Sequence, residues 1–319
     1  MDCTIKWNHI NDHEWDTLIS NVPQSNILQT SYYAQAASKT YNHKSRRGVI
    51  YINENPAGIV QMMENGILFN MLHAIMVDRG PLWFDGFGGA AHIQLFFKEL
   101  DKQFPNRLGR KRRILPEIES SPTADALLKQ TGLTKRDNQD GYQTLWWNLK
   151  NNLEDARTTL SKSWLGSLKK AEKSDLTLSW DDSGKFYPWL KKHYTIDKAK
   201  RGYDGISPQL LDNIAQISTS APTMLIGKAS KEGKDIAAIM LLLHGKSATY
   251  QIGWTSDEGR QFCAHHLLLW DARSVLQQYD IDHIDLGGIN DQSDAAAMGI
   301  KKFKMGTGAQ PVRYIGHYS

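Results

Sequence analysis

The sequence predicts an α/β protein built from two similar halves. Two hairpin patterns carry this prediction. In residues 47–64, the strand-like runs GVIYI and IVQMM flank the turn-forming NENPAG. In residues 223–244, TMLIGKA and IAAIMLLLH flank SKEGKD in the same way. Glycine and proline in these connections are typical of turns between strands.

A third strand, a helix and a fourth strand follow each hairpin, so the same order of elements occurs twice. In the first half, the strand ends near Arg79, the helix covers Ala90–Phe104 and the last strand lies near 112–118. In the second half, the strand ends near Trp254, the helix covers Cys263–Tyr279 and the last strand lies near 283–289. We therefore expect two subdomains with mixed sheets flanked by helices, comprising 1–150 and 151–319. A single helix, Leu153–Lys173, is expected to open the second.

The composition is that of a folded protein, with 40% hydrophobic and 23% charged residues among 319. The longest apolar run, Ile236–Leu243, is far shorter than the roughly 20 residues that a membrane helix needs. Cys3 and Cys263 form neither a disulfide framework nor a metal-ligand pattern. We expect a cytoplasmic protein with no metal, no DNA partner and no signal peptide. The net charge of +4 permits a phosphate-bearing partner without requiring one.

Five stretches together resemble the Fem-type aminoacyltransferases, a branch of the GNAT acyltransferase superfamily. They are SNILQTSYYAQA (25–36), DRGPLW (78–83), SWLGSLKKAEKSDL (163–176), IDLGGI (284–289) and GIKKFKMGTGAQPVRYIGHY (299–318). The most specific part is the DLGGI strand followed by a second expected strand, which contains Phe303 and Lys304.

The resemblance implies two tandem GNAT-like subdomains, with the last strand packed back onto the first. It implies transfer of an amino acid from aminoacyl-tRNA to an amine, as in the building of peptidoglycan cross-bridges for the cell wall. Aminoacyl-tRNA would be a co-substrate, and no bound cofactor is expected. The acceptor would be a cell-envelope precursor or a small metabolite, and a lipid-linked acceptor would bring peripheral contact with a membrane.

Lys304 is the first candidate for chemistry. Attack on an ester produces a tetrahedral intermediate with a negative oxygen, and a fixed ammonium beside that oxygen stabilises it. The resemblance places the Phe303–Lys304 pair at this centre, with Phe303 as a wall of the acyl pocket. A solvent-facing lysine and a simple core phenylalanine are the alternative interpretations.

The strand before this pair supplies further candidates. Gly287 and Gly288 permit a ligand or another backbone to approach closely, although a β-bulge explains paired glycines equally well. Asp285 points away from Ile284 and Leu286 if the segment is extended, as a base, an amine anchor or a structural carboxylate. By analogy with the fold, exposed N–H groups of the strand that ends at Trp254 would polarise the reacting carbonyl.

The loop before the second helix bears on the donor. GNAT enzymes that use acyl-CoA place a glycine-rich loop there to hold pyrophosphate at the helix N-terminus. Here the segment reads GRQFCAHHLLLW, with Cys263 or Ala264 where the central glycine belongs. This departure disfavours acyl-CoA, which stays the alternative donor. His265 and His266 are adjacent and face different ways on a helix, so they predict no metal site.

Two basic groups are candidates for phosphate contacts. Lys162, Lys169 and Lys173 share one helix face and are expected to meet the backbone of a tRNA, although a solvated face is the commoner explanation. Arg201 and Tyr203 belong to an expected loop that would meet a phosphate on the acceptor.

Two positions depart from the peptidoglycan-specific pattern. Ala37 and Ser207 stand where that pattern carries basic residues. The acceptor therefore need not be the usual nucleotide-linked muropeptide. A non-catalytic binding protein on the same fold is the hypothesis from a different class.

Overall fold

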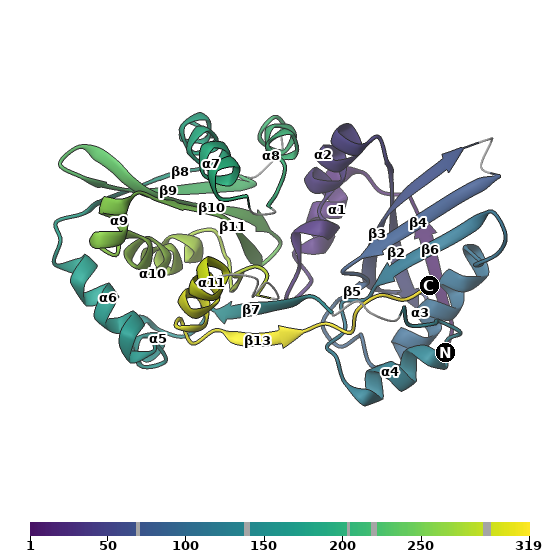
Figure 1. Cartoon of the computed structure of the whole chain (residues 1–319). Coiled ribbons are helices and arrows are strands. Elements are labelled where there is room, and N and C mark those ends of the chain that lie inside the picture. The colour runs from purple at the N-terminus through teal and green to yellow at the C-terminus, as the bar shows by residue number, and fades with distance from the viewer. Residues whose placement is uncertain (68–70, 137–140, 203–204, 218–221, 290–294) are drawn as a thin grey trace. The chain divides into compact units, whose positions relative to one another are not determined.

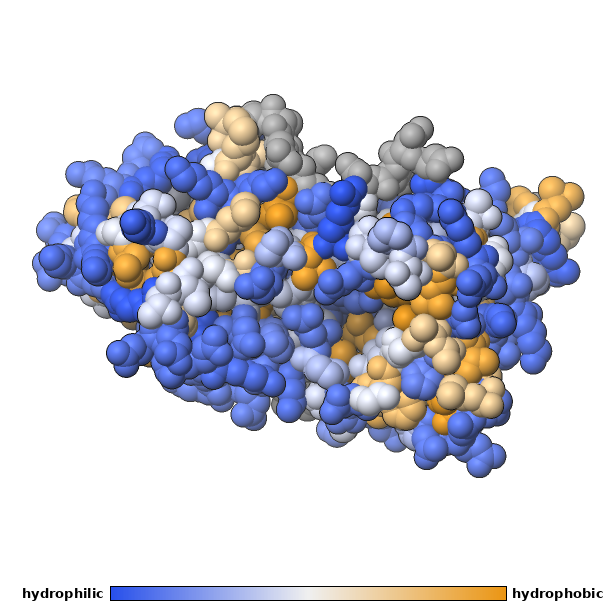
Figure 2. All heavy atoms as spheres, turned by 90° about the horizontal axis from the view of Figure 1, so that it is seen from below, coloured by the Kyte–Doolittle hydropathy of each residue, from blue (hydrophilic) through white to orange (hydrophobic). Residues whose placement is uncertain are grey.

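The computed structural model describes residues 1–67, 71–136, 141–202, 205–217, 222–289 and 295–319, which form two compact units. The first comprises Met1–Gln143 together with Val312–Ser319, and the second comprises Thr144–Pro311. Among the described residues, no helix has the length and apolar character needed to cross a membrane. Hydrophilic side chains cover most of the face drawn in Figure 2, with hydrophobic ones gathered in patches.

The first unit is a six-stranded sheet with helices on both faces (Figure 1). Its strands are β1 (Cys3–Trp7), β2 (Lys44–Ile52), β3 (Asn55–Ile67), β4 (Leu72–Asp78), β5 (Leu82–Trp83) and β6 (Arg110–Leu115), in the order β1-β2-β3-β4-β6 with β5 beside β3. Its helices are α1 (Asp12–Ile19), η1 (Ile27–Gln29), α2 (Ser31–Tyr41), α3 (Ala90–Gln103) and α4 (Pro122–Lys129).

The second unit repeats this plan around a seven-stranded sheet. Its strands are β7 (Gln143–Asn148), β8 (Thr177–Asp181), β9 (Met224–Lys231), β10 (Lys234–His244), β11 (Ser247–Thr255), β12 (His283–Asp285) and β13 (Gln310–Arg313), in the order β13-β7-β12-β11-β10-β9-β8. Its helices are α5 (Leu153–Thr158), α6 (Lys162–Glu172), α7 (Tyr187–Arg201), α8 (Pro208–Ala215), α9 (Asp257–Gln261), α10 (Ala264–Gln277) and α11 (Ala295–Met305).

The duplicated order predicted from the sequence is confirmed. In each unit a three-stranded antiparallel meander is followed by a helix and a parallel strand, which pairs β4 with β6 and β11 with β12. Both hairpins close on two residues with positive φ, Asn53–Glu54 and Glu232–Gly233. Two such residues match the strand twist, which explains why the polar turn sequences mark the hairpins so clearly.

Each sheet buries both faces. In the first unit, Phe96, Phe97 and Leu100 of α3 pack against one face, while Trp15 of α1 packs with Ile59 on the other. In the second unit, α6 and α10 cover one face of the sheet and α7 and α8 lie on the other (Figure 1). Because both faces are covered, the central strands are apolar runs instead of alternating ones, as in β10.

Two predicted elements are wrong. The single helix Leu153–Lys173 is two helices, α5 and α6, because Ser161 caps α6 with its side chain and starts a new helix there. The Phe303–Lys304 pair lies near the end of helix α11, not in a strand. The stretch is rich in lysines, at 301, 302 and 304, and this polar pattern is typical of a helix that buries only one face.

The C-terminal residues lie against the first unit, to which they belong. Tyr318 is fully buried and forms β-bridges with Ile114 and Lys135, and its hydroxyl donates a hydrogen bond to Asp125. Tyr314 bridges Glu119. The chain therefore returns at its end to the unit in which it began.

Candidate functional site

The candidate site of the second unit lies where β11 and β12 separate. These parallel strands pair from Ser247–His283 to Thr249–Asp285, after which β12 ends while β11 continues to Thr255. A β-bulge at this level shifts the register of β11 against β10. The gap between the strands and the bulge, which redirects side chains, make this point of the sheet suited to ligand contacts.

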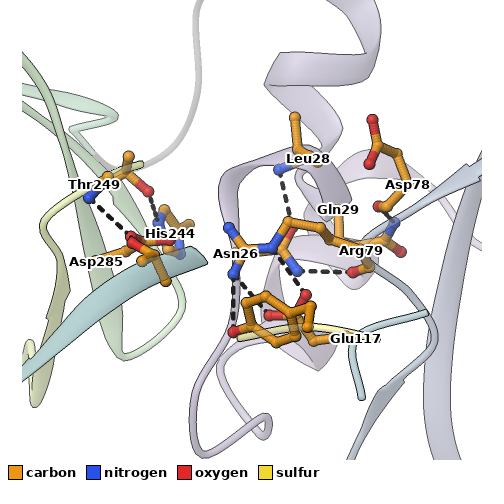
Figure 3. Close-up of polar contacts among 12 residues, drawn as sticks. Asn26, Leu28, Gln29, Asp78, Arg79, Glu117, His244, Thr249 and Asp285 are labelled. Atoms are coloured by element: carbon orange, nitrogen blue, oxygen red, sulfur yellow. Dashed lines mark hydrogen bonds and ion pairs between the residues drawn. The ribbon is translucent and has the colours of Figure 1, made fainter. Parts of the chain in front are cut away.

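Asp285 anchors the end of β12. It is buried, and its carboxylate accepts hydrogen bonds from the Thr144 hydroxyl of β7 and from the backbone N–H of Gly287, at 2.9 Å for the latter. On the neighbouring strand, Thr249 makes a 2.9 Å hydrogen bond with His244 (Figure 3). Through the hydrogen bond to Gly287, Asp285 fixes the turn that follows, whichever of its three interpretations holds.

That turn brings the backbone to the Lys304 ammonium. Gly287 has a φ of +78°, which a glycine adopts without strain. The Lys304 Nζ donates a 3.0 Å hydrogen bond to the carbonyl of Gly288. A Cβ added at Gly287 would lie 3.4 Å from this Nζ, so the glycine also keeps the space beside the ammonium open.

Lys304 is a buried cation, with only 8% of its surface exposed. Burial lowers its pKa to about 8, because the charged form loses its hydration, and the negative charge of Asp285 acts in the opposite direction. Among the residues that the structure describes, Gly288 O is the one acceptor within hydrogen-bond distance of Nζ. An ammonium has three N–H donors, so the described residues use one of them and leave two unused.

Phe303 faces an aromatic cluster instead of solvent. Its ring contacts Trp164 of α6 and both His265 and His266 at the start of α10, with centroids 5.0 to 6.1 Å apart. Burial lowers the pKa of both histidines to about 4, so they are neutral near pH 7. The His265 Nε2 lies 3.2 Å from the carbonyl of Ala238, which requires a proton on that nitrogen. These histidines pack and position the neighbourhood of Phe303.

Two other predicted residues, Trp254 and Arg201, make their contacts with helix α7 instead of Lys304. Trp254 packs against Trp189 and His193 of α7, with ring centroids 5.3 and 4.5 Å away. Arg201 is not in a loop, as expected, but in the last turn of α7, because Gly202 in a left-handed conformation ends that helix one residue later. Its guanidinium pairs with Asp197 at 2.8 Å. Tyr203 lies outside the described residues.

The three lysines expected to face tRNA are all exposed. Lys162 and Lys169 lie on α6, and Lys173 is its C-terminal cap.

The sequence did not single out Thr144 or Tyr250. The Tyr250 hydroxyl occupies the space where a Cβ of Gly253 would stand. The lack of a side chain at Gly253 therefore leaves room for this hydroxyl. Neighbouring side chains of a strand point to opposite faces of the sheet, so the predicted strand GYQTLWWNL places Thr144 on the face opposite Leu145. This alternation was the available signal for Thr144.

Comparisons with known proteins bear on the second unit and on the fold of the chain. The model of the FemAB family matches residues 211–319, which include β12, Lys304 and the C-terminal strand. The crystal structure of FemX superposes with a TM-score of 0.80 at 13% identity, over 98% of this chain and 96% of that one. Residues 211–319 thus resemble the FemAB family, and the whole chain shares the fold of FemX. The predicted fold class, an α/β protein with two mixed sheets flanked by helices, is confirmed.

Other solved structures share the fold of this chain. A conserved protein of unknown function from Bacteroides thetaiotaomicron VPI-5482 superposes with a TM-score of 0.61 at 14% identity, over 99% and 98% of the two chains. The C-terminal domain of a putative lysylphosphatidylglycerol synthetase from Agrobacterium fabrum superposes with a TM-score of 0.54 at 12% identity, over 97% and 91%. The comparison with curated proteins gave no match.

Proposed function

We propose that this Fem-type protein is an acyltransferase that moves an aminoacyl group from aminoacyl-tRNA to an amine on a cell-envelope precursor or small metabolite. The FemAB match and the FemX fold support the coarser part, an acyltransferase of the kind that serves peptidoglycan. The observation that carries the proposal is the buried ammonium of Lys304, held by one backbone carbonyl at the separation of β11 and β12.

The proposed reaction is aminolysis of an ester. The acceptor nitrogen attacks the ester carbonyl, a C–N bond forms, and the carbonyl oxygen becomes negative in the tetrahedral intermediate. The C–O bond to the tRNA ribose then breaks, the nitrogen loses a proton and the ribose oxygen gains one. Lys304 would donate its free N–H groups to the oxyanion, a contribution of roughly 3 to 4 kcal/mol in a water-excluded site.

The loop before α10 supports tRNA over acyl-CoA as the donor. Cys263 stands at the N-cap with a φ of +56°, and its carbonyl already accepts the N–H of His266 at 3.0 Å. Pyrophosphate needs several free N–H groups at the helix N-terminus, and the hydrogen bond from His266 to Cys263 uses one of them.

The exposed lysines of α6 give the proposal a surface for RNA. Lys162, Lys169 and Lys173 carry positive charge on one side of the second unit, as the backbone of a tRNA requires. We propose that they position the donor without touching the reacting atoms.

The deciding experiment identifies the donor. Purified protein is mixed with a pool of cellular amines and with either charged tRNAs or acyl-CoAs that carry a label, and ribonuclease serves as the control. We expect transfer from tRNA that ribonuclease abolishes. Transfer from acyl-CoA alone would replace the donor by the alternative one. A Lys304→Met variant that complements a deletion strain fully would favour the non-catalytic binding protein.

A further inference from the structure

One end of the sheet in the first unit exposes apolar side chains. Met71 precedes β4 and Leu72 begins it, with 74% and 46% of their surfaces exposed, and Leu108, two residues before β6, is fully exposed. In Figure 1 this end, where β3 stops and β4 starts, lies at the right-hand margin, clear of α1 and α2. Figure 2 shows hydrophobic atoms at the same margin. We call Met71, Leu72 and Leu108 together the apolar tip.

The three residues of the apolar tip lie together because β4 and β6 are parallel neighbours. Their ladder begins with His73 of β4, so the segments that precede the two strands meet at one end of the sheet. The His73 N–H donates a 2.7 Å hydrogen bond to the carbonyl of Gly109. A Cβ added at Gly109 would lie 2.6 Å from the Met71 carbonyl oxygen and 3.7 Å from the Leu72 Cδ2. The turn that carries Leu108 is therefore packed against the start of β4.

A tight turn presents Leu108. Arg107 and Arg110 exchange two backbone hydrogen bonds, of 3.2 and 2.8 Å, so that Leu108 and Gly109 form the two residues of the turn between them. Gly109 has a φ of +80°, a conformation that glycine favours at the second position of such turns. Leu108 therefore stands at the corner of a turn whose backbone is closed by hydrogen bonds.

Three cations accompany the apolar tip. Arg107 and Arg110 flank the turn, and Lys111 follows it on β6. Within the described ranges of the chain, none of these three side chains forms an ion pair with a carboxylate. Neither 65–77 nor 104–115 contains an aspartate or a glutamate. This end of the sheet therefore combines exposed apolar side chains with positive charge that the neighbouring sequence does not neutralise.

This combination matches the surface of a bilayer that contains anionic lipids. Exposed apolar side chains can enter the boundary between headgroups and acyl chains, and nearby cations are attracted to the lipid phosphates. A stable protein partner would need roughly 800 Å² on each side, and three side chains at the end of a sheet supply far less. RNA would meet the arginines through its phosphates but would leave the apolar tip in water.

We infer that the apolar tip docks this protein on a membrane surface that carries anionic lipids. The side chains of the tip would enter the bilayer interface, while Arg107, Arg110 and Lys111 would lie at the level of the headgroups. The tip would bind the lipids themselves, so no lipid-linked acceptor is required. The inference goes beyond the proposed function and stands whether or not the chain transfers an aminoacyl group, because Lys304 belongs to the other unit.

The test is a vesicle sedimentation assay with the full chain. Vesicles of phosphatidylcholine alone are compared with vesicles that also contain about 30% phosphatidylglycerol, a lipid with a negative headgroup. We expect at least about 10-fold tighter binding to the anionic vesicles, since each basic side chain near such a surface contributes about fivefold. No binding at about millimolar lipid, or equal affinity for the two kinds of vesicle, would overturn the inference. Self-association that depends on Leu108, without vesicle binding, would replace the membrane by a second copy of the chain.

An apolar variant tests insertion of the tip. Leu108→Ser should weaken binding to the anionic vesicles about 10-fold, because it removes apolar surface that would enter the lipid. The fold should be unaffected, since the Leu108 side chain is fully exposed. Ile196→Ser is the matched control, because Ile196 is 57% exposed on α7 of the other unit. Equal losses in the two variants would count against the tip.

A charge variant tests the role of the cations. Arg107→Gln combined with Lys111→Gln should weaken binding to the anionic vesicles about 10-fold and change binding to the neutral ones little. The control combines Lys192→Gln with Lys200→Gln, which removes the same net charge at exposed positions of α7. The control should bind within about twofold of the wild type, because charges beyond about 10 Å from the lipid surface are screened. The same loss in both double variants would attribute binding to net charge and overturn the assignment to the tip.

Discussion

The Lys304 ammonium donates to the backbone carbonyl of Gly288 at 3.0 Å, in the turn that follows β12. One residue lies on a helix and the other follows a strand, and 15 residues separate them in the sequence. Asp285 fixes the turn from within the sheet by accepting the Gly287 N–H. The ammonium is therefore held by the main chain, which cannot change rotamer, and this suits a group that must stay beside a reacting oxygen.

Lys304→Met should lower the turnover number by about 100-fold to 1,000-fold, because it removes the donor proposed for the oxyanion. The same change should leave the fold intact. The measurement is single-turnover transfer with the donor that the first experiment identifies. Lys302→Met serves as the matched control, since Lys302 lies on the same helix and is exposed. A turnover number within twofold of the wild type would contradict the role given to Lys304.

The same substitution should stabilise the protein near pH 7. Burial holds the Lys304 pKa at about 8, below its ordinary value of 10.5, so the folded state pays for keeping the lysine charged below pH 8. Lys304→Met removes that cost and loses one hydrogen bond, with an expected net gain of about 2 kcal/mol in the free energy of unfolding. The gain should shrink as the pH rises from 8 towards 10.5. Urea unfolding at pH 7 and pH 10 measures it, and a destabilised variant at pH 7 would be inconsistent.

The pH profile of transfer should fall on its alkaline side near the Lys304 pKa of about 8. The ammonium form donates to the oxyanion, and this form is lost as the pH rises through that value. Deprotonation of the acceptor amine would produce the rising limb at lower pH. A Lys304→Arg variant with residual activity should move the falling limb to higher pH, because arginine stays protonated. A falling limb that does not move would assign it to another group.

Gly287→Ala should reduce both stability and transfer. Its φ of +78° costs a residue with a Cβ about 1 to 2 kcal/mol, and the methyl group would fill space beside the Lys304 Nζ, 3.4 Å away. Gly184→Ala is the matched control, since Gly184 has a φ of +82° and open space around its Cα. Both variants should lose similar stability in thermal unfolding. A comparable loss of transfer in both would mean that Gly287 serves the backbone alone.

Gln29→Leu should lower the free energy of unfolding by about 2 to 4 kcal/mol. The change leaves the Gln61 N–H and two strand carbonyls unpaired in a buried position, and each such group is costly. Gln35→Leu is the control on helix α2, because its amide bonds to Asp12 at an exposed site. Chemical denaturation of the two variants gives the comparison. Equal small effects would show that solvent replaces the amide of Gln29.

The sequence by itself determined the duplicated order of elements. The turns Asn53–Glu54 and Glu232–Gly233, the apolar run of β10 and the helices around residues 90–103 and 264–277 are local signals that packing did not override. It also carried the resemblance to the Fem-type family, through short stretches such as IDLGGI (284–289). The candidates Lys304, Asp285, Gly287 and Gly288 could be named from such short stretches.

Only the tertiary structure decided what those residues contact. The stretch at 295–305 has too little pattern to separate helix from strand, and packing of Phe303 against Trp164 and His266 favours the helix. Thr144 meets Asp285 across 141 positions of sequence, and Gln29 enters a ladder formed 32 and 49 residues away. Such contacts depend on sheet order and on burial, which alter hydrogen bonding and pKa values without leaving any local trace in the sequence.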